Sequence, residues 1–243
     1  IGRYRMKQNY LDEVDQYRNR IEQLSNLVNQ KDLDAMKRVL QRLDFISDKE
    51  IVELKGRVAA TITAADEIVL TELLVDGTFS NLSNENIVSF LTVFVSESGN
   101  NGGKTKDNKK EESSFVTDEV PKELVPAWTQ LQRVVQRVAT ISLECGCDID
   151  VDRFKSSFSP SMMELAIQWA QGVSFSQLME SYPNYYEGSI IRTMKRLDEL
   201  LNQTAKAAEL LNNRELKTKL EESSALIKRG IVFSASLYID SKS

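Results

Sequence analysis

Residues 187–212 read EGSIIRTMKRLDELLNQTAKAAELLN, and this stretch decides the fold. When the residues are set at about 100 degrees each, as in an α-helix, the apolar side chains fall on one side. These apolar residues are Ile190, Met194, Leu197, Leu201, Ala208 and Leu211. An apolar side of this length is expected to lie in a core. The stretch therefore predicts a long helix packed in a mainly α fold.

The opposite side of the same helix carries a narrow polar stripe. It consists of Arg192, Arg196, Glu199, Gln203 and Lys206. One interpretation is a solvated helix face with a helpful charge pair between Arg196 and Glu199. The other is a nucleic-acid contact, because a short apolar helix over 174–181 and a turn precede the long helix, as in a helix-turn-helix. Arginine planes and amide groups stack on or hydrogen-bond to unpaired bases, which is typical of single-stranded RNA recognition.

The composition limits the chemistry that the chain can perform. Its 243 residues include 31 basic and 36 acidic side chains, a net charge of -5, and no histidine. Without histidine there is no Ser-His-Asp or Cys-His nucleophile system and no histidine metal ligand. The acidic balance also provides no basic field for strong nonspecific binding of nucleic acid. A nucleic-acid strand on the polar stripe must therefore be delivered and held by groups other than this stripe.

Cysteine usage and hydropathy indicate a compartment. Cys145 and Cys147 are too close together for a disulfide that stabilises the fold, and two cysteines are too few for a tetrahedral zinc site. We therefore expect ordinary thiols in a reducing compartment. No apolar run reaches the length of a membrane span, and residues 1–10 are basic and polar rather than signal-like. We expect a cytosolic or nuclear protein with no metal site and no membrane partner.

The chain also lacks a phosphate-binding loop of the Gly-x-x-x-x-Gly-Lys-Ser/Thr kind. Because it begins with Ile1 as well, we interpret it as a segment of something larger or as a non-catalytic module.

Residues 10–28 have the apolar spacing of a coiled coil. Steps of four and three residues separate Tyr10, Val14, Tyr17, Ile21, Leu24 and Val28. Two interpretations stay open, a helix packed on its own domain and a stalk that projects from it. In both we expect this apolar seam to be covered by another helix or chain.

Residues 34–62 predict a helix followed by a β-hairpin. Helical spacing over 34–43 changes to a period of two near Phe45, and Lys55–Gly56 looks like a tight turn, because glycine accepts positive φ. The hairpin would hold Ile51, Val52, Val58 and Ile62. A helix followed by a hairpin is typical of the end of a winged helix.

The remainder is predicted to be nearly all helical, apart from one long loop. Residues 98–117 combine glycines with Lys, Glu and Ser. Such a segment buries too little apolar surface to offset the conformational entropy that it would lose on ordering, so we expect a mobile surface loop. Ser83 is expected to cap one of the helices, and Gly172 to end another. The predicted helices cover 66–76, 84–96, 126–146, 161–171, 174–181, 187–212 and 214–229.

Several short stretches carry a resemblance to a known family. They are Val52-Glu-Leu-Lys-Gly-Arg-Val-Ala, Leu70-Thr-Glu-Leu-Leu, Met163-Glu-Leu with Trp169-Ala-Gln-Gly, Phe175-Ser-Gln-Leu-Met, Tyr186-Glu-Gly-Ser-Ile-Ile-Arg-Thr-Met-Lys-Arg-Leu-Asp-Glu-Leu and Ile227-Lys-Arg-Gly-Ile-Val-Phe-Ser-Ala-Ser-Leu-Tyr. In this order, over about 34–238, they resemble the C-terminal helical domain of exosome-associated DExH-box RNA helicases. The ending is more similar to the cytoplasmic superkiller (antiviral) helicase than to its nuclear relative. The chain departs from the family at the long loop 98–117 and at Gly230.

The resemblance implies a division into three parts and a site. Residues 1–30 would be a coiled-coil arm (the returning helix of the family's arch), 31–63 the end of the winged-helix domain, and 64–243 the helical bundle with the loop 98–117. The long helix would be the ratchet helix that lies along the RNA path. Its implied RNA contacts are Arg196 and Glu199, with Arg192 one turn earlier, and we include Gln203 from the same stripe.

The resemblance also implies an activity for the parent protein. That protein would be an ATP-dependent 3′–5′ RNA helicase, an ATP hydrolase that pulls RNA through two RecA-like domains and hands it to the exosome. ATP and Mg²⁺ would bind the RecA domains, so this segment would carry no catalytic residues and no cofactor. The implied partners are single-stranded RNA, the RecA domains, superkiller-complex subunits and the RNA exosome, in the cytoplasm. Two alternatives stay open: a protein-interaction scaffold made of arm and bundle without RNA contact, and the equivalent part of a DNA helicase.

Overall fold

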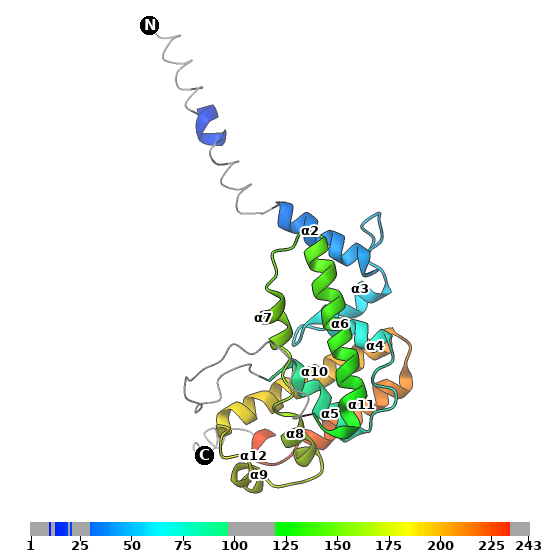
Figure 1. Cartoon of the computed structure of the whole chain (residues 1–243), viewed down its shortest axis with the longest axis vertical. Helices are drawn as coiled ribbons and strands as arrows, with labels where there is room; N and C mark the ends of the chain where they lie inside the picture. Colours follow the sequence, from blue (N-terminus) through cyan, green and yellow to red (C-terminus); the bar gives the residue numbers. More distant parts are fainter. Residues whose placement is uncertain (1–9, 11–12, 19, 21–29, 97–119, 234–243) are drawn as a thin grey trace, which may run out of the picture.

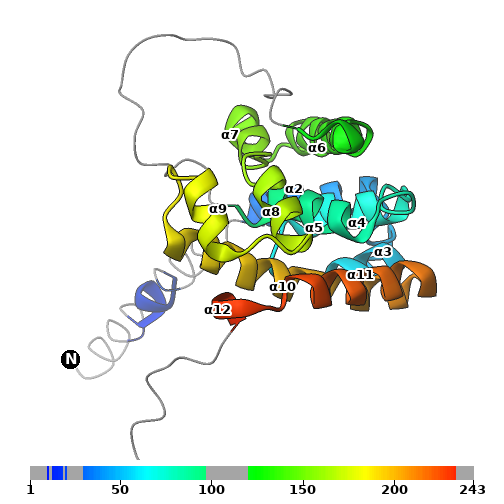
Figure 2. The same ribbon diagram turned by 90° about the horizontal axis from the view of Figure 1, so that it is seen from below.

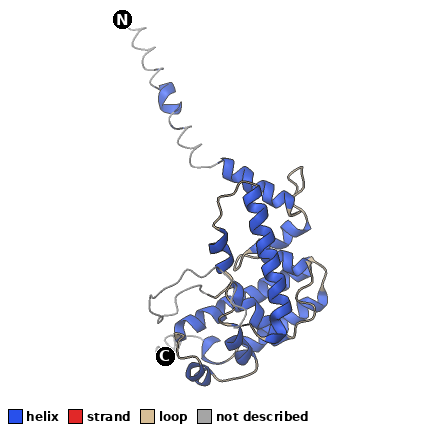
Figure 3. Cartoon of the chain, viewed as in Figure 1, coloured by secondary structure: helices blue, strands red, loops and turns tan. Residues whose placement is uncertain are grey.

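The computed structural model describes residues 10, 13–18, 20, 30–96 and 120–233. Helices make up most of this part of the chain (Figure 3), so the predicted mainly α fold is confirmed. Short 3₁₀ helices η1 (Thr92–Phe94) and η2 (Lys122–Leu124) flank the α-helices. The α-helices are α2 (Gln30–Arg42), α3 (Leu54–Ala59), α4 (Glu67–Val75), α5 (Asn84–Leu91), α6 (Val125–Glu144), α7 (Val151–Ser156), α8 (Met163–Ala170), α9 (Phe175–Ser181), α10 (Glu187–Leu210), α11 (Arg214–Ile227) and α12 (Gly230–Phe233).

The helices form three layers. Figure 2 shows α6 and α7 on one side of a middle layer that contains α4, α5 and α8, with α10 and α11 on the other side. The long helices α10 and α11 are joined by a short turn and pack along each other. Helix α2 lies at one end of the molecule, beside α6 (Figure 1). In this arrangement α10 is an outer helix, with one side on the bundle and the other toward solvent.

The core between the layers is apolar and rich in aromatic rings. Trp128 on α6, Trp169 on α8 and Phe90 on α5 are almost completely buried, and the rings of Phe79 and Phe90 meet edge to face at 5.7 Å. Burial of such side chains is the main favourable contribution to folding. Val39, on α2, belongs to the same cluster as these rings. The division of the chain at residue 63 stays a prediction.

Several predicted helices begin at the residues that the sequence indicates, because side chains there satisfy free backbone N–H groups. Asp66 accepts a hydrogen bond from the Val69 N–H at 2.8 Å and begins α4. Ser83 accepts one from the Asn86 N–H at 3.3 Å and begins α5. The predictions over 66–76 and 84–96 are confirmed, the second with its last turn in η1.

The β-hairpin predicted over 51–62 is wrong. Helix α3 occupies 54–59, and an isolated antiparallel bridge between Ile46 and Val52 is the β-structure present among the described residues. Gly56 lies inside α3, where a Cβ atom would stand 2.8 Å from Val52 Cγ1 and closer still to the Phe45 carbonyl oxygen. Glycine is needed there because α3 passes close to the preceding loop, not because the chain turns.

The region between α6 and α9 differs in detail from the prediction. Helix α7 was not predicted; Asp150 begins it by accepting a hydrogen bond from the Arg153 N–H at 3.0 Å. Helix α8 begins at Met163, two residues after the predicted start. Its predicted end is confirmed: Gly172 has a φ of 102°, and the Val173 N–H donates to the Gln168 carbonyl at 3.0 Å.

The coiled-coil prediction falls mostly outside the described residues. Within the described part, Tyr10, residues 13–18 and Arg20 are helical, and Figure 1 shows residues 13–18 away from the bundle. The seam residue Tyr17 is 65% exposed, and Tyr10 and Val14 are exposed as well. These three side chains therefore do not pack on the bundle within this chain, while the cover of the seam by another chain stays a prediction. The predicted loop 98–117 lies outside the described residues.

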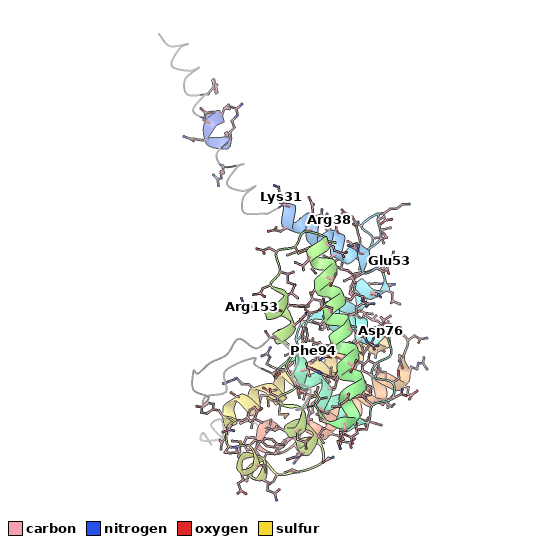
Figure 4. The ribbon with its side chains drawn as sticks, in the orientation of Figure 1. Lys31, Arg38, Glu53, Asp76, Phe94 and Arg153 are labelled. Carbon is pink, nitrogen blue, oxygen red and sulfur yellow. The ribbon has the colours of Figure 1, made fainter. Side chains whose placement is uncertain are left out.

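Polar contacts join the part before residue 63 to the bundle. On α2, the guanidinium of Arg38, which is labelled in Figure 4, donates to the Cys145 carbonyl at 2.7 Å. Glu72 on α4, with only 2% of its side chain exposed, forms ion pairs with Lys55 on α3 at 2.8 Å and with Arg137 on α6. A buried carboxylate with two cationic partners holds three helices at one point.

The C-terminal end of the described chain is fixed on Trp169. The Arg229 guanidinium lies 3.8 Å from the centre of the Trp169 ring and donates to the carbonyls of Trp169 and Val173, the latter at 2.7 Å. The Trp169 indole N–H donates in turn to the Ile227 carbonyl at 3.0 Å. Burial lowers the pKa of Arg229, a direction that leaves a guanidinium charged at neutral pH. This stacking holds the short link between α11 and α12 against the Trp169 ring on α8.

Candidate nucleic-acid interface on α10

Both ends of α10 are set by local interactions. Tyr186 precedes it with an extended backbone, and its carbonyl accepts hydrogen bonds from the N–H groups of Ser189 and Ile190 at 2.9 and 3.1 Å. At the other end Asn212 has a φ of 56°, and the Asn213 N–H donates to the Ala208 carbonyl at 2.9 Å. This is a Schellman ending with asparagine in the left-handed position. The hydrogen-bonded turn at Asn212 and Asn213 therefore sets the direction in which the chain enters α11.

The predicted core side of α10 is confirmed. Ile190, Met194, Leu197, Leu201 and Ala208 are buried, and Leu211 just after the helix is half-buried. This side contacts α3, α5, α11 and α12. Packing on four helices fixes the rotation of α10, so the residues on its other side point to solvent.

The predicted polar stripe is on that solvent side. Arg192, Arg196, Glu199 and Lys206 are exposed, and Gln203 is half-buried. The structure therefore brings all five residues together on one face, as the helical period requires. Binding of RNA by these residues stays a prediction.

Gln203 differs from the rest of the stripe because its amide is fully engaged. Its oxygen accepts from the N–H groups of Thr63 and Ala64 at 2.8 and 3.0 Å. Its nitrogen donates to Thr63 Oγ1 at 2.9 Å and to Glu199 Oε1 at 3.2 Å. These hydrogen bonds use the two acceptor and two donor positions of a side-chain amide. Gln203 thus ties α10 to the segment between α3 and α4 and also orients Glu199.

Arg192 points toward the beginning of α10. Its Nη2 donates to Ser189 Oγ at 3.2 Å, and a Cβ atom at Gly188 would lie 3.8 Å from its Nη1. Long side chains on a helix lean toward its N-terminus in this way. The guanidinium is therefore near Gly188, at the N-terminal end of the stripe.

The charges on this face include both like and opposite neighbours, since Glu199 lies one turn after Lys195 and Arg196. Arg192 and Arg196 are one turn apart, and Lys195, also exposed, lies between them. Like charges at this spacing destabilise a helix by a few tenths of a kcal/mol, about 0.2–0.5 per pair. Positive charge in the first turns also opposes the helix dipole.

The short helix and the turn that the sequence predicts before the long helix are present as α9 and residues 182–186. Helix α9 begins with a capping box in which Ser174 accepts from the Gln177 N–H and the Gln177 side chain accepts from the Ser174 N–H. In the turn, the Tyr185 hydroxyl donates to the Ser161 carbonyl at 2.8 Å. The turn that positions the start of α10 is thereby fixed to the segment before α8.

Two exposed residues beside the stripe were not among the predicted contacts. Lys195 lies one position before Arg196, and Tyr186 precedes the helix with 67% of its surface exposed. The spacing of three between Arg192 and Lys195 is a signal that could have shown the first. The sequence alone does not show whether a tyrosine ring is exposed or buried, because tyrosine occurs in both environments.

The described residues contain no group of three or more His, Cys, Asp or Glu side chains that could hold a metal ion. Among them, too, no helix combines the length and apolar character that crossing a membrane requires. Both cysteines are free thiols, and burial raises the pKa of Cys147.

Known proteins similar to this chain are named as RNA or antiviral helicases. The chain is 38% identical to "Exosome RNA helicase MTR4" of Mus musculus over 86% of its own length and 19% of that protein. It is 34% identical to "ATP-dependent RNA helicase mtr4" of Schizosaccharomyces pombe over 97% of the chain and 20% of that protein. It is 32% identical to "Antiviral helicase SKI2" of Saccharomyces cerevisiae over 90% of the chain and 17% of that protein.

These similarities confirm the helicase resemblance and are compatible with a superkiller-like member. The chain spans about a fifth of the length of these relatives. The family model described as "DSHCT (NUC185) domain" matches residues 49–234, which include every helix from α3 to α11. The chain therefore belongs to the DSHCT (NUC185) domain family.

Proposed function

We propose that the chain is the C-terminal part of an ATP-dependent 3′–5′ RNA helicase that feeds RNA to the exosome, and that α10 guides the single strand. The names of the MTR4 and SKI2 relatives support the helicase class, and MTR4 is named as an exosome RNA helicase. In the proposal the RecA-like domains of the parent protein bind ATP and Mg²⁺. The present segment supplies a surface along which the strand moves.

The exposed face of α10 carries the proposal. Arg192, Lys195 and Arg196 are exposed within little more than one turn. A guanidinium can stack on an unpaired base or pair with a phosphate when a strand is present. The face is held still by the four hydrogen bonds of Gln203 and by the packing of the opposite side.

Glu199 has a separate role in the proposal. Its carboxylate is an acceptor, so it can bind a 2′-hydroxyl or an exocyclic amino group of a base. A carboxylate beside arginines also weakens phosphate binding, which suits a strand that must be released at each step. We therefore assign loose contact with sugars and bases to Arg196 and Glu199, rather than tight contact with phosphates.

The remaining partners belong to the same proposal. They are the RecA domains of the parent protein, superkiller-complex subunits and the RNA exosome, in the cytoplasm. The name of the MTR4 relative as an exosome RNA helicase supports the exosome as a partner, and the other partners and the compartment are proposed from the family resemblance.

The first prediction tests the stripe in the full-length parent protein. Changing Arg196 and Glu199 together to Ala should weaken RNA duplex unwinding at least fivefold, because truncating a side chain that stacks on a base costs roughly 1–3 kcal/mol. Thermal unfolding should change little, since exposed substitutions usually alter stability by less than about 0.5 kcal/mol. RNA-independent ATP hydrolysis should persist, because the substitutions remove no nucleotide ligand.

A matched control carries the changes Arg133→Ala and Glu123→Ala, which remove one exposed arginine and one exposed glutamate away from α10. It should unwind RNA as the wild type does. Unchanged unwinding in the α10 variant would return the stripe to a solvated helix face. Equal loss on DNA and RNA duplexes would favour a DNA helicase or a general strand-binding role.

A protein-interaction scaffold is the second candidate function, favoured by one observation. Tyr10, Val14 and Tyr17 present exposed apolar surface in the described part of the arm. A scaffold would keep its partners when the stripe is altered and lose them when these seam residues are changed to Ser. Co-purification of partners with the two sets of variants distinguishes the candidates.

A further inference from the structure

Tyr186 is an aromatic residue that the bundle leaves uncovered. It is 67% exposed, whereas Tyr182 and Tyr185 in the same turn are half-buried. Between Leu143 and Leu210, a range that the structure describes in full, it is the one exposed large hydrophobic residue. Its neighbours Asn184 and Glu187 are exposed polar residues.

The ring of Tyr186 has no visible task in the fold. Only the backbone carbonyl of this residue takes part in starting α10, through the N–H groups of Ser189 and Ile190. The side chain forms no capping hydrogen bond. An exposed ring that the helix does not need is a candidate for contact with another molecule.

The Arg192 guanidinium lies at the same end of α10. It approaches Gly188 and Ser189, the second and third residues of the helix. Tyr186, just before α10, and Arg192, in its second turn, thus expose an aromatic ring and a guanidinium plane that are both able to stack on a base.

We propose that Tyr186 stacks on an unpaired base of the RNA and, with Arg192, forms one end of the strand-binding face of α10. This inference rests on the proposed function. From residue 186 to residue 196 the helical rise gives roughly 15 Å, so Tyr186 would contact a different nucleotide from the one at Arg196. Every base has a face on which a ring can stack, so this interaction is independent of sequence.

A single-stranded nucleic acid fits Tyr186 better than a protein surface does. The buried centre of a protein interface is apolar over many residues. Tyr186 has exposed polar neighbours in the chain, and the exposed basic residues Arg192, Lys195 and Arg196 follow it within the first three turns of α10. One isolated ring beside positive charge is the arrangement that base stacking with backbone attraction requires.

The test uses the full-length parent protein and a short single-stranded RNA that contains 5-iodouridine. Tyr186→Ala should weaken RNA binding about fivefold or more, the equivalent of about 1 kcal/mol at the low end of base–aromatic stacking. Tyr186→Phe keeps the ring and should stay within about twofold of the wild type on the same grounds. Irradiation should attach the RNA to residue 186 in the wild type and in the Phe variant, and not in the Ala variant.

Leu210→Ala, an exposed apolar truncation at the other end of α10, serves as the control and should bind RNA normally. Unchanged affinity of Tyr186→Ala would overturn the inference. Two other results would also overturn it. An equal loss of affinity in Tyr186→Phe would indicate a contact through the hydroxyl group. A lower melting temperature with normal RNA affinity would indicate that the ring packs within the protein. If Arg196→Ala impairs unwinding while Tyr186→Ala has no effect, the inference alone fails and the proposed function stands.

Discussion

At the scale of single residues, Asp66 shows how one carboxylate both starts a helix and responds to pH. It accepts the Val69 N–H at 2.8 Å at the beginning of α4. Burial raises its pKa above the ordinary value of 3.8, and the hydrogen bond from Val69 offsets part of this rise. A raised pKa means that the folded state binds this proton more tightly than the unfolded state.

The raised pKa of Asp66 makes the stability of the chain depend on pH. The contribution of Asp66 to stability is fully present below pH 3.8 and is lost as the pH rises through the raised folded-state pKa. Asn is an equally good helix cap and does not ionise. The free energy of unfolding of Asp66→Asn, relative to the wild type, should therefore increase as the pH rises from below 3.8 and become constant near neutral pH.

Urea unfolding of the chain across this pH range measures the difference. Asp66→Ala is the control; it removes the cap and should be less stable than the Asn variant by about 1 kcal/mol at each pH. A relative stability of Asp66→Asn that decreases with rising pH would contradict the prediction. It would mean that the helix N-terminus stabilises the carboxylate more than burial destabilises it.

At the scale of elements, α10 depends on one side chain for its attachment to the segment before α4. Gln203 satisfies the N–H groups of both Thr63 and Ala64 and at the same time holds Glu199. A polar residue on an exposed face is usually replaceable. Here its removal leaves two backbone donors without their protein acceptor.

Gln203→Ala is therefore expected to lower the free energy of unfolding by about 1–2 kcal/mol, because Thr63 is exposed and water replaces part of the hydrogen bonding. Lys206→Ala, one turn later on the same exposed face, should change it by less than about 0.5 kcal/mol. Urea unfolding of the two variants gives the comparison. Equal stability of both would show that the amide hydrogen bonds contribute nothing net.

At the scale of the whole molecule, the buried Glu72 joins helices that are far apart in the sequence. Lys55 on α3 and Arg137 on α6 both pair with it, and Lys55 also donates to the Leu43 carbonyl at 3.2 Å. The cost of taking these charges out of water offsets much of their attraction. Removal of one charged partner therefore lowers the free energy of unfolding by more than the intact ion pairs contribute to it.

Glu72→Gln should destabilise the chain by about 3 kcal/mol, the low end for a broken buried pair, because the two cations stay partly exposed. Glu180→Gln on α9, an exposed site, is the matched control and should have an effect below about 0.5 kcal/mol. Chemical unfolding of both proteins provides the measurement. A Glu72 variant as stable as the wild type would show that desolvation cancels the pairing completely.

Sequence alone determined the features that depend on near neighbours in the chain. The buried side of α10, the cap Ser83 and the helix end at Gly172 are all as predicted. Helical period and capping act within about four residues, so they are visible without a structure. The short family stretches indicated the C-terminal helical domain of an exosome-associated RNA helicase, and the match to the DSHCT (NUC185) domain agrees with that resemblance.

The tertiary structure decided the features that depend on distant residues. Gly56 looks like a turn in the sequence but lies in α3, because the backbone of Phe45 passes against it. Gln203 looks like a free member of the stripe but is held by Thr63 and Ala64, 140 and 139 residues away. The exposure of Tyr186 likewise depends on which helices pack around the turn. Close approach, hydrogen-bond partners and exposure arise when the chain brings remote segments together, and the helical period of one segment contains no information about them.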